Sequence, residues 1–512
     1  MKRKIEMLKK LMIILLVMLM IIGIGVFWIC HNFLPEKEER IAYDKEKRIQ
    51  QIDKQLLGID LTSVRAKSAL IMEKSIDDLQ MAIRTGKLSY EELTAFYLDR
   101  IRTIDLGPNG LNATVEINPN VMAKARACDH HPEKGRGLTG IPVLIKDNIN
   151  TKDMPTSGGT FALKDFRPKD NATVVNELIK SGAIILGKSN LSELANFMDF
   201  KMPSGYSSKA GQTHNPFNPM KLSPLGSSSG SGVAVAANFS TVAIGTETTG
   251  SIIAPSTIHS IVGFKPQREA ISTEGVIPLS PTLDTVGTMA KNVADAISLY
   301  NASITDKSKT IILNNSKDFM KGKRIGIVGD KENKLKTLLV KNGAIPVNIS
   351  ISEKDIDNDF MINQEFKGQL SNYLQKYDAP VKSLSDLIAF NQKDLGRRAK
   401  YGQALLEEAN EERKQEKQKV KKMVAIAQRR LKNQFINKEL DAIVFYDNSG
   451  VLLPAVAGYP EMTVPIGKSK KGEPIGASFV TLNNQEQFLA DLSYSFEQKT
   501  QARLIPQKYL DN

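Results

Sequence analysis

The hydrophobic pattern of the chain begins with an uncharged apolar run at residues 11–30. At about 1.5 Å per residue, a helix of this length spans about 30 Å, the thickness of a bilayer core. Basic residues precede the run, and Trp28 lies near its far end, where aromatic side chains favour the membrane interface. The pattern predicts a transmembrane signal-anchor at 11–30, a basic cytoplasmic tail at 1–10, and the rest of the chain outside the cell.

Two alternatives exist for the apolar run. A cleaved signal peptide has a shorter apolar core and a small-x-small cleavage site, and no such site follows residue 30. The residues before Cys30 also lack the small residue of a lipoprotein cleavage site. A buried core helix is the second alternative, but such a helix rarely follows a basic flank. An uncleaved single-pass anchor in the cell membrane is the favoured interpretation.

Residues 31–67 differ from both of their neighbours. They are rich in charge and show no stable hydrophobic period. This composition is typical of a loose or helical stalk, which would hold the main body of the chain away from the membrane.

Beyond residue 67, helical and strand-like periods alternate. Between Ile76 and Asp105, apolar residues recur at helical spacing; Gly86 ends a first helix, and Ser89 with Glu92 forms a capping box for a second. Residues 405–435 predict a long surface helix or a helix pair. Short apolar runs predict strands at 140–146, 183–186, 241–244, 440–445 and 462–467. This order of elements predicts an α/β fold whose sheet is covered by helices on both faces.

Composition narrows the classes of function. The net charge is +13, but Lys and Arg are scattered without an arginine-rich arm, so nucleic-acid binding is not favoured and attraction to an anionic membrane surface explains the charge. Two cysteines give no internal disulfide framework. The five histidines do not pair with cysteines at ligand spacing. We therefore predict no structural zinc and no cofactor.

Two segments rich in Gly and Ser, 226–232 and 245–251, carry the candidate chemistry. The first has the composition of a flexible linker, but a small-residue helix and a strand follow it directly. Nucleotide binding is disfavoured, because neither GxxxxGK[ST] nor a strand followed by GxGxxG is present. Both segments lie at strand–helix junctions, where hydroxyls and backbone N–H groups are exposed to a ligand.

A serine nucleophile in these segments needs a base, and no histidine offers an obvious partner. A lysine can serve if burial lowers its pKa enough to populate the neutral amine. Lys146 ends the apolar run that starts at Ile141, so the strand would carry it into the sheet. A lysine that reaches solvent from a strand end is the alternative, and the residues by themselves leave both open.

The combination of Lys146, GSSSGSG and GTETTGSI resembles the amidase signature family. The likeness extends over most of the chain past the predicted stalk, through GIPVLIKDNINTKDMPTSGG, SELANF, GQTHNPFNP, VGFKP and GYPEMTVPIG. This resemblance implies a single large α/β domain with a mixed sheet at 68–508. Its catalytic core would lie near 138–300, and a variable helical insertion near 305–437.

The resemblance also implies a role for each matching residue. Ser251 matches the acylated nucleophile, Ser227 the bridging serine that relays protons, and Lys146 the general base. The Gly226–Ser227 peptide is expected to be cis. The backbone N–H groups of the oxyanion hole would come from Thr248, Thr249, Gly250 and Ser251. Gly226, Ser228 and Ser229 would support the loop.

Three positions depart from the pattern of many family members. Glu247, Thr249 and Ile253 stand where Asp, Gly and Arg are common. If the glycine at the position of Thr249 has a positive φ, a β-branched residue there is strained. The departures put rate and specificity in doubt more than the type of reaction.

The implied activity is the hydrolysis of linear amides. The variants GSSSGSG and GTET, with GYSSKAGQTHNPF, look most like the peptide-amidase branch, which points to C-terminal carboxamides of peptides. Lipid amides are an alternative, since fatty acid amide hydrolase also combines this fold with an N-terminal membrane segment. A second alternative is a weak or inactive enzyme that acts as an anchored binding protein. The amidotransferase A subunit shares the catalytic trio but is cytosolic, and the predicted anchor argues against it. The sequence assigns neither the physiological substrate nor the oligomeric state.

Overall fold

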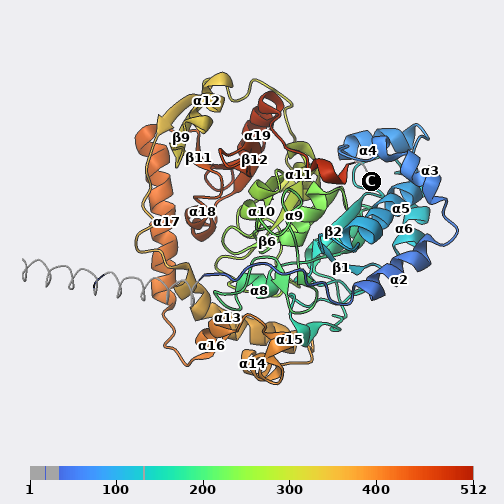
Figure 1. The fold of residues 1–512 in the computed structure, drawn as a ribbon. Coiled ribbons are helices and arrows are strands. Elements are labelled where there is room, and N and C mark those ends of the chain that lie inside the picture. Colours follow the sequence, from blue (N-terminus) through green and yellow to red (C-terminus); the bar gives the residue numbers. More distant parts are fainter. Residues whose placement is uncertain (1–17, 19–33, 131–132, 511–512) are drawn as a thin grey trace, which may run out of the picture.

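A mixed β-sheet runs through the whole domain in the computed structural model, which describes residue 18 and residues 34–130 and 133–510 (Figure 1). Within these residues the sheet has 11 strands in the order β1-β3-β2-β6-β8-β7-β12-β13-β11-β9-β10. β2 is parallel to both of its neighbours, β3 and β6, and β9 is parallel to β10 and β11. The remaining pairs in this sheet are antiparallel, so the predicted mixed α/β sheet is confirmed.

The strands have these bounds: β1 (Thr114–Ile117), β2 (Pro142–Lys146), β3 (Ile184–Ser189), β4 (Tyr206–Ser207), β5 (Gly211–Gln212), β6 (Val242–Glu247), β7 (Val262–Lys265), β8 (Thr285–Ala290), β9 (Arg324–Val328), β10 (Ile345–Asn348), β11 (Ala442–Tyr446), β12 (Glu461–Lys468) and β13 (Pro474–Val480). β4 and β5 form a separate two-stranded ladder. The helices of the first half are α2 (Lys45–Leu56), α3 (Leu61–Ala66), α4 (Ile76–Arg84), α5 (Tyr90–Arg100), α6 (Val121–Asp129), α7 (Thr173–Lys180), α8 (Glu193–Asn196), α9 (Ser229–Ala236) and α10 (Ile253–Ile258). Those of the second half are α11 (Val293–Ser303), α12 (Lys334–Lys341), α13 (Asn358–Lys376), α14 (Leu384–Gln392), α15 (Leu395–Arg398), α16 (Ala404–Asn410), α17 (Lys417–Lys438), α18 (Leu452–Ala457) and α19 (Glu486–Thr500).

Helices cover both faces of the sheet, and two neighbouring residues of β7 show this directly. Successive side chains of a strand point to opposite faces. Gly263 lies against Ser256 of α10, so closely that a side chain at this position would collide with it. Phe264 packs on Tyr300 of α11, with ring centroids 5.2 Å apart. α10 and α11 therefore lie on opposite faces, as predicted from the order of elements.

Most local predictions for the helices hold. Between α4 and α5 the chain turns at Gly86, whose φ is +70°. The capping box is present: Glu92 N–H donates to Ser89 Oγ at 3.1 Å, and Ser89 N–H donates to Glu92 Oε2 at 2.9 Å. The predicted helix pair near 405–435 is α16 and α17, and α17 lies at the edge of the molecule opposite α2 to α6 (Figure 1).

The predicted insertion at 305–437 is only partly helical. β9 and β10 lie inside it and extend the main sheet beyond β11. The buried residues of β9, such as Ile325, pack in the same core as the strands near the centre of the sheet. The sheet therefore reaches well past residue 300.

The prediction of a loose stalk is wrong for the part of 31–67 that the structure describes. Ile52, Leu56 and Val64 are buried in the main core. The guanidinium of Arg48 is buried and donates to Asn112 Oδ1 and to a backbone carbonyl of β1. These contacts make α2 and α3 part of the domain. The helices are short and their apolar positions few, so the helical period is hard to recognise among the charged residues.

The predicted membrane span at 11–30 lies outside the described residues, except for Met18. Among the residues that the structure describes, no helix is both long enough and apolar enough to cross a bilayer.

Candidate active site

Lys146 lies at the carboxyl end of β2, a strand that pairs with β3 on one side and β6 on the other. All five residues of β2 are buried, and the exposed fraction of Lys146 is 0%. Its Nζ lies 2.8 Å from Ser227 Oγ, 2.9 Å from Thr246 Oγ1 and 3.1 Å from the Thr246 carbonyl oxygen. The strand therefore carries the amine to the serine rather than to solvent.

Burial lowers the pKa of Lys146 from 10.5 to about 7, because the charged amine is removed from water. Two nearby carboxylates, Asp284 and Glu247, act in the opposite direction and raise it. A pKa near neutrality populates the free amine at physiological pH, so Lys146 can accept a proton.

Ser227 lies two residues before α9, in the first glycine- and serine-rich segment. The segment is ordered and buried, which excludes the linker interpretation. The Gly226–Ser227 peptide is cis, as expected. Ser228 holds the segment against β6, because its Oγ donates to the Thr246 carbonyl at 3.0 Å. Ser229 donates from its Oγ to the Leu225 carbonyl.

Ser251 lies in the turn between β6 and α10, and its exposed fraction is 6%. The backbone N–H of Ser228 donates to the Ser251 carbonyl at 3.1 Å, so the two serine segments are joined. Glu247 holds the other side of the turn: its Oε2 accepts from the N–H groups of Ile252 at 2.7 Å and Ile253 at 3.0 Å. The structure thus brings Lys146 and Ser227 into contact and joins the turn that carries Ser251 to the segment of Ser227.

The expected strain at Thr249 is absent. The positive φ of the turn falls on the next residue, Gly250, at +77°. Thr249 instead donates from Oγ1 to Asn358 Oδ1 of α13 at 2.6 Å. The β-branched side chain therefore ties the turn to a helix without adopting a left-handed backbone.

Residues 248–251 form the turn that follows β6, where the oxyanion hole is predicted, and we name them the oxyanion loop. Within the described part of the chain, the backbone N–H groups of these four residues donate to no backbone carbonyl. Thr248 fixes the loop, because its Oγ1 donates to Asp284 Oδ1 at 2.6 Å. Free N–H groups in a fixed turn can stabilise a negatively charged oxygen.

Comparison with known proteins shows the family to which the chain belongs. Residues 92–446 of the chain match the amidase family. The chain belongs to the amidase family. A probable amidase of Arabidopsis thaliana is 34% identical over 85% of this chain and 92% of its own length. Two solved structures are similar over nearly their full length. An amidase family protein from Bacillus anthracis has a TM-score of 0.88 and 42% identity, and the match covers 92% of this chain and 100% of that protein. The peptide amidase from Stenotrophomonas maltophilia has a TM-score of 0.78 and 35% identity, and the match covers 85% of this chain and 98% of that enzyme.

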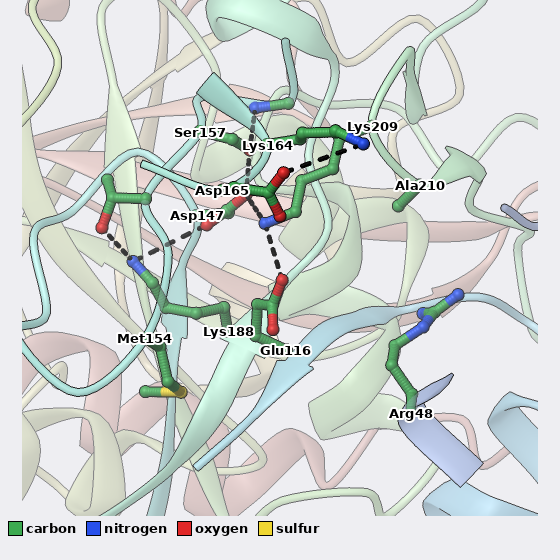
Figure 2. Close-up of polar contacts among 12 residues, drawn as sticks. Arg48, Glu116, Asp147, Met154, Ser157, Lys164, Asp165, Lys188, Lys209 and Ala210 are labelled. Atoms are coloured by element: carbon green, nitrogen blue, oxygen red, sulfur yellow. Dashed lines mark hydrogen bonds and ion pairs between the residues drawn. The ribbon is translucent and has the colours of Figure 1, made fainter. Parts of the chain in front are cut away.

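A buried ion cluster supports the strand end in this amidase (Figure 2). Asp147 directly follows Lys146, and its carboxylate lies 3.7 Å from Lys188 Nζ and 3.2 Å from Lys209 Nζ. Lys209 also pairs with Glu116 at 3.1 Å. The pKa of Lys188 falls to about 8 because the side chain is fully buried. Lys188 contacts neither Ser227 nor Ser251, so this second lysine is placed to hold the chain rather than to activate a serine.

Several residues of the site were not predicted. Thr246 and Asn148 lie inside the quoted motifs, but nothing in the sequence distinguishes them from their neighbours. Asp284 and Asn358 lie far along the chain and come to the oxyanion loop only through folding. The described residues contain no group of three or more His, Cys, Asp and Glu side chains that could hold a metal ion.

Proposed function

We propose that this amidase hydrolyses carboxamide C–N bonds through an acyl-enzyme on Ser251, with Ser227 as proton relay and Lys146 as general base. The observation that carries the proposal is the buried contact between Lys146 Nζ and Ser227 Oγ, at 2.8 Å. Burial gives this lysine a pKa of about 7, so it is available as a base at neutral pH.

The proposed reaction uses these groups one after another. Neutral Lys146 takes the proton of Ser227, which takes the proton of Ser251, and Ser251 Oγ forms a bond to the amide carbon. The backbone N–H groups of Thr248, Thr249 and Gly250 stabilise the carbonyl oxygen as it becomes negative, which contributes about 3–4 kcal/mol per well-placed donor. The C–N bond breaks as Ser227 returns a proton to the nitrogen and Lys146 restores that of Ser227. Water then hydrolyses the ester on Ser251.

The substrates that we propose are peptides with a C-terminal carboxamide. The support is the similarity to a peptide amidase over most of both chains, together with the GSSSGSG and GTET motifs. A panel of peptide amides, acyl amides and simple aliphatic amides, assayed with the purified domain, tests the class. Faster turnover of fatty acyl amides than of peptide amides would contradict it.

We also propose that the enzyme is anchored at the outer face of the cell membrane. Its support is the sequence alone: an uncharged run at 11–30 behind a basic flank. Mass spectrometry of the mature N-terminus is the test. A chain that retains residues 1–30 and is digested by protease added to intact cells agrees with the proposal, whereas a mature chain that starts after residue 30 contradicts the anchor.

A covalent fluorophosphonate probe tests the nucleophile. We expect the probe to label wild type and to spare Ser251→Ala. Ser493→Ala is the matched control, because Ser493 is also a buried serine but lies in α19. Equal labelling of Ser251→Ala and wild type would refute the assignment. A folded wild type that neither reacts with the probe nor hydrolyses any amide would instead be a binding protein on the same fold.

A further inference from the structure

A second buried lysine, Lys265, ends β7 on the face of the sheet that α10 covers. Its exposed fraction is 1%. Gly263, two residues earlier on the same strand, lies against Ser256 of α10, so Lys265 points to the same face. The Nζ of Lys265 donates to the Tyr459 carbonyl. The proposed reaction does not use this lysine, and a buried ammonium is costly unless a negative charge lies near it.

Two buried carboxyl groups share this face with Lys265. Glu461 lies directly opposite Lys265 on β12, and the side chains of such a strand pair are neighbours. Glu247 ends β6, and its Oε2 accepts from two backbone N–H groups at the start of α10. β8 lies between β6 and β7, and its residue next to Lys265 is Gly287. β8 therefore places no side chain beside Lys265 on the side of Glu247.

The three groups act on one another by charge. Burial lowers the pKa of Lys265, whereas Glu247 and Glu461 raise it. Arg268 and Glu486 are further charged groups that act on Lys265, with opposite signs. Burial and the negative charge of Glu247 raise the pKa of Glu461 well above 4.5, so this carboxyl favours its neutral form. The ammonium of Lys265 is then left to balance one carboxylate, that of Glu247.

Glu247 is the carboxylate that holds the turn of Ser251. It is 1% exposed, and its two N–H donors belong to the residues directly after Ser251. Its other oxygen, Oε1, has no hydrogen-bond partner among the described residues. Such a buried carboxylate needs a positive charge nearby to stay ionised. Lys146 does not supply it, because the proposed base is neutral when it acts.

From these observations we infer that Lys265 is a positioning residue for the nucleophile: its ammonium keeps Glu247 ionised, and ionised Glu247 fixes the turn that carries Ser251. The inference rests on the proposed function, in which Ser251 attacks the amide carbon. Without the ammonium, Glu247 takes up a proton and accepts more weakly from the two N–H groups. The turn then loses its fixed geometry, and a misplacement of about 1 Å can cost about 100-fold in rate.

The first test is a double-mutant cycle of Lys265→Met and Glu247→Gln. Lys265→Met should lower kcat about 100-fold and leave KM within about twofold of wild type, because it disturbs the nucleophile rather than substrate contacts. Glu247→Gln keeps an oxygen that can accept from the same N–H groups and needs no cation. Lys265→Met should therefore cost at most about threefold when it is added to Glu247→Gln. An equal cost in both backgrounds would overturn the inference.

The second test follows kcat between pH 7 and pH 9. Wild-type activity should about double, because about half of Lys146 is already neutral at its pKa of about 7. In Lys265→Met, Glu247 must also lose a proton before the turn is fixed, so activity should rise about tenfold or more. Asp284 and Glu247 are the charged groups that act on Lys146, and both remain in this variant. The same twofold rise in the variant as in wild type would contradict the inference.

Lys291→Met is the matched control for loss of a buried lysine. Lys291 is 5% exposed and follows β8 at the end opposite to Thr285, the residue that pairs with Glu247. This variant should keep kcat and its pH dependence close to wild type. A loss as large as that of Lys265→Met would assign the effect to a general loosening of the core and would overturn the inference.

Folding of each variant is measured by circular dichroism. If Lys265→Met does not fold, the double variant should fold, because it removes the buried carboxylate together with its ammonium. A double variant as unfolded as Lys265→Met would overturn the inference. Wild type that is inert to amides and to the fluorophosphonate probe would refute the proposed function, whereas active wild type with equal losses in both backgrounds refutes the role of Lys265 alone.

Discussion

Lys146 and Asp284 are coupled across the site, although 138 positions separate their numbers in the chain. Lys146 contacts Thr246 at the end of β6, and Asp284 holds Thr248, two residues further on, through a hydrogen bond of 2.6 Å. The negative charge of Asp284 raises the pKa of Lys146 against the larger lowering that burial causes. The same carboxylate therefore fixes the oxyanion loop and adjusts the base.

The pH dependence of activity should follow the ionisation of the Lys146 amine. The neutral amine is the active form, and its pKa is about 7. Activity is therefore low when pH is well below 7, rises as pH passes through 7, and levels off above it. A profile of kcat/KM between pH 5 and 9 measures this rise in activity, which we call the acidic limb. A flat profile over the range would contradict the assignment of Lys146 as base.

Asp284→Asn should move the acidic limb of the kcat/KM profile to lower pH. The substitution removes a negative charge that favours the ammonium form, so the pKa of Lys146 falls. The pKa of Asp284 itself is raised to about 6 by burial, so the carboxylate is charged at pH 7 and above. The shift is measured from the kcat/KM profile, with Asp318→Asn as an exposed control. A limb that stays in place or moves to higher pH would refute the coupling.

Lys146→Ala should remove activity while the protein remains folded. Loss of a positioned general base costs about 10²- to 10⁴-fold in rate. The domain should still fold, because the variant loses a buried amine that is costly to desolvate. Turnover at pH 7 and the circular dichroism spectrum measure the two effects. Wild-type turnover in a folded variant would exclude the proposed role.

Gly250→Ala should damage the oxyanion loop more than any change at Thr249. Gly250 has a φ of +77°, and an added Cβ would lie 3.1 Å from Val451 Cγ2. The left-handed backbone costs a residue with a side chain about 1–2 kcal/mol. We expect a lower kcat and a lower melting temperature. Thr249→Ser, which keeps the hydroxyl to Asn358 at a position without positive φ, should retain most of the activity; the reverse order of effects would contradict this description of the loop.

The N-terminal segment should contribute to stability. A chain that starts at residue 34 keeps α2 and α3, whereas a chain that starts at residue 68 loses the buried side chains of Ile52, Leu56 and Val64. Burial of each such side chain is worth about 1.5–3 kcal/mol. Urea unfolding of the two chains should therefore give a clearly lower midpoint for the shorter one. Equal midpoints would support a stalk that does not belong to the domain.

Five strands of the main sheet could be predicted, because burial leaves a strong local pattern. β2 and β6 lie inside the sheet, so their residues form continuous apolar runs that end in Lys146 and in the GTETTGS motif. The capping box of α5 could be predicted for a similar reason, since Ser89 and Glu92 lie three positions apart and each side chain accepts from the backbone N–H of the other. The packing of α2 could not, because it depends on Arg48 and a few apolar side chains whose partners lie in β1 and beyond.

The sequence by itself determined the alternation of helices and strands, five strands of the main sheet, the family likeness and the three residues that we propose for the chemistry. These features are encoded in short segments, where neighbouring residues act together. Only the tertiary structure decided which residues surround them. Asp284 and Asn358 reach the oxyanion loop from distant segments, Gly250 rather than Thr249 takes the positive φ, and Asn148 keeps one buried oxygen free. Charge, strain and hydrogen bonding at a site depend on all groups that folding brings within a few ångströms, and a local pattern records only those that are close in the chain.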